Sequence, residues 1–193
     1  MPKVFLESTD PRDLNIYGSS IDHKKPAEHR DYILLFEKFV TDDTDGLIYF
    51  GVKSDSWRSY PGTPCLFGGA RKLGEDYKKA LSRELKEESK NCLTFQGNPM
   101  IFFGGAARTF YWSPNVAGNI HNFHGAAGEE MKDILAISAT YLATHNNNVR
   151  ELGNELCDLV DANAGREQFL RSDTLAAIRH WLSVIFPQIC RQN

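Results

Sequence analysis

Residues 69–91 read GARKLGEDYKKALSRELKEESKN and gather many carboxylates in a short segment. In an α-helix, which turns by roughly 100° per residue, Glu84, Glu87 and Glu88 share one face. Like charges at this spacing repel each other, so a helix that keeps three of them usually holds a cation. Carboxylate oxygens are hard ligands that favour Mg²⁺ or Mn²⁺. The segment therefore predicts a divalent-metal site on a helix.

The spacing within this segment resembles the Nudix box, G-x5-E-x7-R-E-U-x-E-E-x-G-U, in which U is a bulky apolar residue. The matching positions are Gly69, Glu75, Arg83, Glu84, Leu85, Glu87 and Glu88. Lys90 stands where the family has its second glycine, and Asn91 stands where it has an apolar residue. Because asparagine tolerates the left-handed conformation that ends a helix, we expect Asn91 to supply the turn one residue late.

A solvated charged face is the alternative interpretation of the three glutamates, because Lys78, Lys79 and Lys86 lie nearby. The residues that precede the glutamates at matching spacing favour the metal site. The resemblance implies that Glu84, Glu87, Glu88 and Gly69 hold the metal. It also implies that Arg83 orients Glu84 or Glu75 without touching substrate. The alternative role for Glu75 is to cap the helix N-terminus, where negative charge is stabilised.

The general base stays open at this point. Enzymes of the family draw it from the box or from a glutamate on a later loop, so Glu84, Glu129 and Glu130 are all candidates. Glu129 and Glu130 follow Gly128 and could instead belong to the first turn of a helix. His121 and His124 in the same loop could contact phosphate or act in acid–base catalysis, although a loop histidine is usually only solvated.

Several residues near the box are candidates for substrate binding. Gly68 and Gly69 would let the backbone pass close to the metal and the phosphates, with an ordinary turn as the alternative. The basic candidates for phosphate contacts are Arg58, Arg71, Lys72 and Arg108. The aromatic candidates for stacking on a base are Phe102, Phe103, Phe110, Tyr111 and Trp112. Only one face of an alternating strand can look into a cleft, so we expect most of these aromatics in the core.

Composition limits the class of protein. The chain has 193 residues, 41% of them hydrophobic, which suits one domain at residues 31–193 after a polar arm at residues 1–30. A net charge of -3 argues against general nucleic-acid binding. The N-terminus lacks the apolar core of a signal peptide, and no run is long enough to cross a membrane. With four scattered cysteines, we expect a cytoplasmic protein with reduced thiols; secretion without an N-terminal signal stays open.

The pattern of apolar residues predicts alternating strands and helices. Strands are expected at residues 32–40 and 47–52, forming a hairpin, and at 65–67, 93–95, 100–103 and 109–112. Helices are expected at residues 75–90, from 131 to 142, from 152 to 160 and at 173–186, the last with Ser172 as N-cap, and residues 116–128 are expected to form a loop. This order favours an α/β fold, and the resemblance implies a three-layer α/β/α sandwich with a mixed sheet and an expanded helical C-terminal part.

These expectations converge on a Mg²⁺-dependent hydrolase that cleaves the phosphoanhydride of a nucleoside diphosphate linked to a group X. Its partner would be a small-molecule nucleotide derivative, and a homodimer is compatible with the sequence. One alternative is a catalytically silent module that keeps the fold and senses a nucleotide. Another is a different chemistry on the same scaffold, such as an isomerase of isoprenyl diphosphates or a glycosyl hydrolase of nucleotide sugars.

Overall fold

The computed structural model describes residues 29–56, 61–104, 108–126, 128–160 and 172–191. Most of the expected N-terminal arm lies outside the described residues, as does Arg58, and β1 begins at Arg30. Within the described ranges, no helix combines the length and apolar character needed to span a bilayer.

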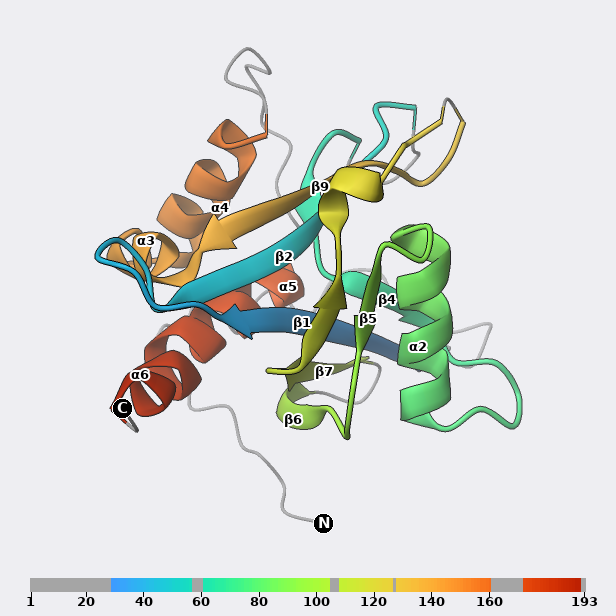
Figure 1. Cartoon of the computed structure of the whole chain (residues 1–193), viewed down its shortest axis with the longest axis horizontal. Coiled ribbons are helices and arrows are strands. Elements are labelled where there is room, and N and C mark those ends of the chain that lie inside the picture. The colour runs from blue at the N-terminus through green and yellow to red at the C-terminus, as the bar shows by residue number, and fades with distance from the viewer. Residues whose placement is uncertain (1–28, 57–60, 105–107, 127, 161–171, 192–193) are drawn as a thin grey trace.

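A mixed sheet forms the centre of the protein (Figure 1). The expected hairpin is present: β1 (Arg30–Lys38) and β2 (Gly46–Lys53) pair antiparallel, with Leu35 opposite Tyr49. On the other edge of β1 lies β7 (Arg108–Ser113), which runs parallel to it, and β6 (Met100–Gly104) follows beyond β7. The two short strands β3 (Pro64–Cys65) and β4 (Phe67–Ala70) pair with β2 and β1, respectively. They bring the start of the acidic segment to the central strand.

Helices cover both faces of this sheet. Alternate residues of β1 point to opposite sides, so that Ile33 packs in a core with Leu81 and Leu85 of α2 (Tyr77–Glu88). Leu34 packs on the other side, against the C-terminal helices. These are α3 (Ala139–Thr144), α4 (Val149–Asp158), α5 (Ser172–His180), a π-helical turn (Trp181–Ile185) and α6 (Phe186–Cys190). The predicted three-layer α/β fold with a helical C-terminal part is therefore confirmed (Figure 1).

One predicted helix is wrong. Residues 131–138 form the strand β9 (Met131–Ser138), which pairs antiparallel with β2, and only the residues that follow form the short helix α3. The pairing register shifts between Val52 and Lys53, and this bulge places Met131 and Ile134 in the same core. Two buried residues three positions apart imitate helical spacing, which explains the error.

The expected loop at residues 116–128 also contains regular structure. Val116–Gly118 forms β8, which pairs antiparallel with β5 (Leu93–Phe95) in a separate two-stranded sheet. A 3-10 turn, Ile120–Asn122, follows, and the Asn119 side chain accepts a hydrogen bond from the backbone N–H of His121. The segment leads through Glu129 and Glu130 directly into β9, so these two glutamates precede a strand and not a helix.

Candidate functional site

The acidic helix α2 begins two residues after Glu75, at Tyr77. Asp76 is its N-cap, and the Asp76 side chain accepts a hydrogen bond from the backbone N–H of Lys79 at 2.8 Å. Glu75 is therefore not the helix cap, as one interpretation of the sequence had it. The buried face of α2 consists of Ala80, Leu81, Leu85 and Glu88. Because Glu88 lies on the same face of α2 as these apolar residues, its carboxylate is buried when the helix packs against the sheet.

Arg83 lies at the centre of the carboxylate cluster. Its guanidinium donates to both carboxylate oxygens of Glu75, at 2.8 and 2.9 Å, and to Glu84 at 2.6 Å. A further bond reaches the carbonyl oxygen of Ala70 at 3.0 Å and ties the helix to the end of β4. The hydrogen bonds from Arg83 lower the pKa of Glu75 to about 2. Arg83 therefore makes the contacts that the resemblance implied, and its functional role stays a prediction.

The two glycines of β4 bring backbone against the carboxylates of α2. The backbone N–H of Gly68 donates to Glu88 at 2.8 Å. At Gly69, an added Cβ would lie 2.7 Å from the carboxyl carbon of Glu84, which is closer than a side chain allows. Burial raises the pKa of Glu88 to about 8. Both glycines therefore allow a close approach: Gly68 to the backbone of Asp31 and Tyr32, and Gly69 to the carboxylate of Glu84.

Lys53 is the residue of this site that the sequence analysis missed. It ends β2, and its ammonium nitrogen lies 3.8 Å from Glu88 and forms an ion pair with Glu130. The carbonyl oxygen of Glu130 also accepts a hydrogen bond from the backbone N–H of Ser54 at 2.8 Å. The sequence did contain one signal for Lys53. It is a charged residue at the end of an apolar strand, and a side chain in that position can reach a site at the edge of the sheet.

The donor set fits a hard cation, although the described residues contain no group of three acidic, histidine or cysteine side chains already gathered as a metal cage. Cations of the chain hold the carboxylates: Arg83 bonds Glu84 and Glu87, and Lys53 lies beside Glu88. Carboxylates gathered in this way supply the oxygen ligands that Mg²⁺ prefers.

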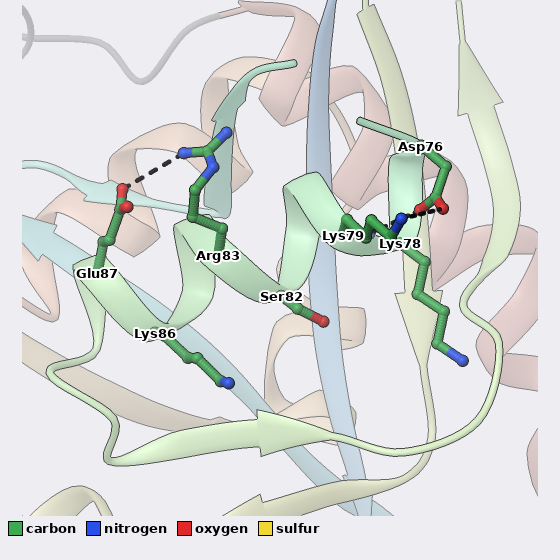
Figure 2. A pocket seen from close by; sticks show the side chains of 7 residues that line it. All are labelled: Asp76, Lys78, Lys79, Ser82, Arg83, Lys86 and Glu87. Atoms are coloured by element: carbon green, nitrogen blue, oxygen red, sulfur yellow. Dashed lines mark hydrogen bonds and ion pairs between the residues drawn. The ribbon is translucent and has the colours of Figure 1, made fainter. Parts of the chain in front are cut away.

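A hollow beside α2 shares Arg83 and Glu87 with this cluster but does not include its inner carboxylates. It is lined by Asp76, Lys78, Lys79, Ser82, Arg83, Lys86 and Glu87 (Figure 2). Glu87 points toward Arg83 in this view, and its side chain is 57% exposed. Because the hollow includes neither Glu84 nor Glu88, we place the candidate chemistry at the inner carboxylates and not here.

The remaining predicted residues are mostly engaged elsewhere. Arg71 forms two hydrogen bonds of 2.9 Å with the buried Asp31, and Arg108 forms an ion pair with Asp173. Glu129 pairs with Lys90 and not with the carboxylates of α2. His121 and His124 are exposed. Of the aromatic candidates, those in the core are Phe102, Phe103, Phe110 and Tyr111, as expected for most of the set.

Replacing Arg83 with methionine should destabilise the protein in a pH-dependent way. The pKa of Glu75 is lowered from 4.5 to about 2, so the stabilisation from the Arg83–Glu75 pair is present above the unfolded value and is lost as pH falls through the folded value. The stability gap between wild type and Arg83→Met should therefore shrink from about pH 4.5 to about pH 2. Denaturant unfolding across this range measures it, with Lys86→Met as the control for charge loss; a gap that stays constant would contradict the assignment.

Comparison with known proteins identifies the fold. No family model matches the sequence, and no curated protein matches it by sequence. Among solved structures, a mutT/nudix family protein from Listeria innocua is similar with a TM-score of 0.53 and 14% identity, over 87% of this chain and 99% of that chain. A MutT protein from Methanosarcina mazei Go1 has a TM-score of 0.49 and 15% identity, over 86% of this chain and 97% of that chain. The chain has the α/β fold of the Nudix hydrolases.

Proposed function

We propose that this protein is a Mg²⁺-dependent pyrophosphohydrolase that cleaves the phosphoanhydride of a nucleoside diphosphate linked to a group X. The observation that carries the proposal is the arrangement at β4 and α2. There the backbone of Gly68 and Gly69 runs against Glu88 and Glu84, and Arg83 donates a hydrogen bond to Glu84. A fold shared with Nudix hydrolases adds support for hydrolysis in general.

Each residue of the arrangement has a distinct part in the proposal. Glu84 and Glu88, with Glu87 and the carbonyl of Gly69, would hold Mg²⁺, which when bound neutralises phosphate charge and makes a bound water more acidic. Arg83 keeps Glu84 oriented through a bond of 2.6 Å. Its further bond to Ala70 holds the helix and β4 at a fixed spacing. The chain thereby keeps two acidic side chains in place before a substrate arrives, which lowers the cost of ordering them.

Glu130 is our choice for the proton acceptor among the three candidate bases. Each candidate is ion-paired: Glu84 with Arg83, Glu129 with Lys90 and Glu130 with Lys53. We choose Glu130 because its partner Lys53 also lies beside the buried carboxylate of Glu88. A carboxylate here could take the proton of the attacking water. The Lys53 ammonium, which lies between the two glutamates, would be drawn to the phosphates of a substrate.

A silent nucleotide-binding protein is the second candidate function. It is favoured by one observation: Arg83 and Lys53 already form ion pairs with Glu84 and Glu130, two carboxylates that catalysis would need. Such a protein would bind a nucleotide without turnover.

A substrate panel distinguishes the two candidates. Wild-type protein incubated with Mg²⁺ and nucleoside diphosphate derivatives should release a nucleoside monophosphate and a phosphorylated X from at least one of them. The Glu87→Gln, Glu88→Gln double variant should release none, because two carboxylates of the metal helix lose their charge. Product chromatography measures the result. Binding by calorimetry without product from any compound would favour the silent protein, and equal release by both proteins would sink the catalytic assignment.

A further inference from the structure

Helix α2 ends in a turn that its sequence does not favour. Ser89 is the C-cap, and the two residues that follow, Lys90 and Asn91, both have left-handed backbones with φ of 55° and 61°. The backbone N–H of Asn91 donates to the carbonyl of Lys86 at 3.0 Å, which completes a Schellman turn with Lys90 at the position where glycine is usual. Asn91 adopts the left-handed conformation expected of it, but Lys90 adopts it too, so the turn begins at Lys90 and not one residue late.

A lysine in this conformation is disfavoured, because its Cβ crowds the neighbouring carbonyl. Glycine would make the same turn without this crowding. Residues that break a local rule without gain in stability tend to occur where the side chain serves a function. We therefore expect a contact of the Lys90 side chain to offset the cost of its left-handed backbone.

That side chain reaches the turn before β9. The ammonium of Lys90 pairs with the carboxylate of Glu129, with the two side chains 37% and 32% exposed. The same carboxylate accepts a hydrogen bond from the backbone N–H of Ala126 at 3.0 Å. Lys90 thus joins the end of α2 to a turn that lies 39 residues further along the chain.

The next residue in that turn is Glu130, which is held from the opposite direction. Its carbonyl bonds to Ser54, and its carboxylate pairs with Lys53 beside Glu88. The turn is therefore fixed at two points, one at the end of β2 and one at the end of α2. At the end of β2, Lys53 and Ser54 contact Glu130 itself. At the end of α2, Lys90 contacts Glu129, the residue before Glu130.

We propose that Lys90 is a positioning residue that anchors the Glu129–Glu130 turn to the end of the acidic helix and so holds Glu130 near Glu88. The catalytic consequence rests on the proposed function, in which Glu130 accepts a proton. The structural consequence, a more ordered Glu129–Glu130 turn, does not depend on the proposed function.

Lys90→Gly separates the two effects of this residue. Glycine relieves the left-handed backbone, so the Tm should rise by about 2–4 °C. Loss of the ion pair should speed hydrogen exchange of the Glu129 and Glu130 amides by roughly fivefold, the factor for one partly exposed pair. In the active enzyme, kcat should fall roughly tenfold with KM little changed, because a less ordered Glu130 is less often within reach of the water whose proton it accepts. A higher Tm together with a looser turn is a combination that a merely structural lysine would not produce.

Three further variants make the test specific. Lys90→Arg keeps the charge and should retain wild-type exchange and kcat. Lys86→Met removes a positive charge from the same helix at an exposed position and should leave exchange at the turn unchanged. Glu129→Gln should speed exchange as Lys90→Gly does, and the two effects should not add in the double variant.

Two results would overturn the inference: unchanged exchange at Glu129 and Glu130 in Lys90→Gly, or fully additive effects in the double variant. Exchange is measured without substrate, so its outcome is independent of turnover. The wild-type protein could cleave no substrate while Lys90 and Glu129 still showed coupled effects on exchange. In that case the proposed function would be wrong, and the proposal that Lys90 anchors the turn would hold.

Discussion

Glu88→Gln is expected to lower kcat for the cleaved diphosphate by roughly a thousandfold or more, since a bound cation supplies several kcal/mol of charge stabilisation and each 1.36 kcal/mol is tenfold. The Glu88 side chain is only 5% exposed and lies between the Gly68 amide and Lys53. Glutamine keeps the shape and the acceptor for Gly68 but cannot take up the negative charge with which a carboxylate binds a cation. The fold should therefore survive while metal binding fails.

Glu87→Gln is the matched comparison, because it changes the same group one position away. The Glu87 carboxylate is 57% exposed and bonds to Arg83 at 3.3 Å, so its loss should reduce kcat less than the loss of Glu88. Steady-state kinetics at saturating Mg²⁺ and calorimetric titration with Mg²⁺ measure both variants. An equal or smaller effect at Glu88 would mean that the buried carboxylate is not the main metal ligand.

Stability without metal provides an independent check on Glu88. Burial raises its pKa from 4.5 to about 8, so the folded state binds more protons than the unfolded state between these values, and stability falls as pH rises through them. Glu88→Gln removes this dependence. The variant should match wild type at about pH 4 and become the more stable protein toward about pH 8, as measured by denaturant unfolding in chelator; a parallel pH dependence would contradict burial of the charge.

Local patterns in the sequence sufficed to predict much of the fold. The hairpin of β1 and β2 follows from two apolar runs around a polar turn, and α2 follows from the spacing of Leu81 and Leu85. The strand β9 was missed because its bulge, at the pairing with Lys53, is a property of two strands and leaves no mark in one. Helical spacing in a single sequence cannot distinguish a bulged strand from a helix.

The candidate site was predictable only where its residues are close in sequence. Spacing alone singled out Arg83, Glu84 and Glu88. Lys53 joins them through the pairing of β2 with β3 and β9. Its place at the end of an apolar strand is a signal, but the sequence does not show which partners the strand brings to it. Arg71 was a reasonable phosphate candidate by proximity to the box, but its partner Asp31 lies 40 residues earlier on β1 and occupies its guanidinium in two hydrogen bonds.

Gly68→Ala is expected to cause the largest loss of stability in this region, about 3–5 kcal/mol when left-handed strain and overpacking are combined. Gly68 has a φ of +142°, and an added Cβ would lie 2.2 Å from the carbonyl oxygen of Asp31 and 2.7 Å from the Cα of Tyr32. Both atoms belong to the backbone of β1, which pairs with β4 on one edge and β7 on the other. Neither can move aside without disturbing the centre of the sheet.

Two neighbouring glycines separate strain, crowding and chemistry. Gly74 has a φ of +80° with nothing within 4 Å of an added Cβ, so Gly74→Ala should cost only about 1–2 kcal/mol of strain. At Gly69 the added Cβ meets the Glu84 carboxylate at 2.7 Å. Because that side chain can turn away, Gly69→Ala should leave the Tm nearly unchanged while metal affinity and kcat fall. Thermal unfolding of the three variants beside a Mg²⁺ titration tests the order, and if Gly68→Ala proved as stable as Gly74→Ala, the close contact of β4 with β1 would be wrong.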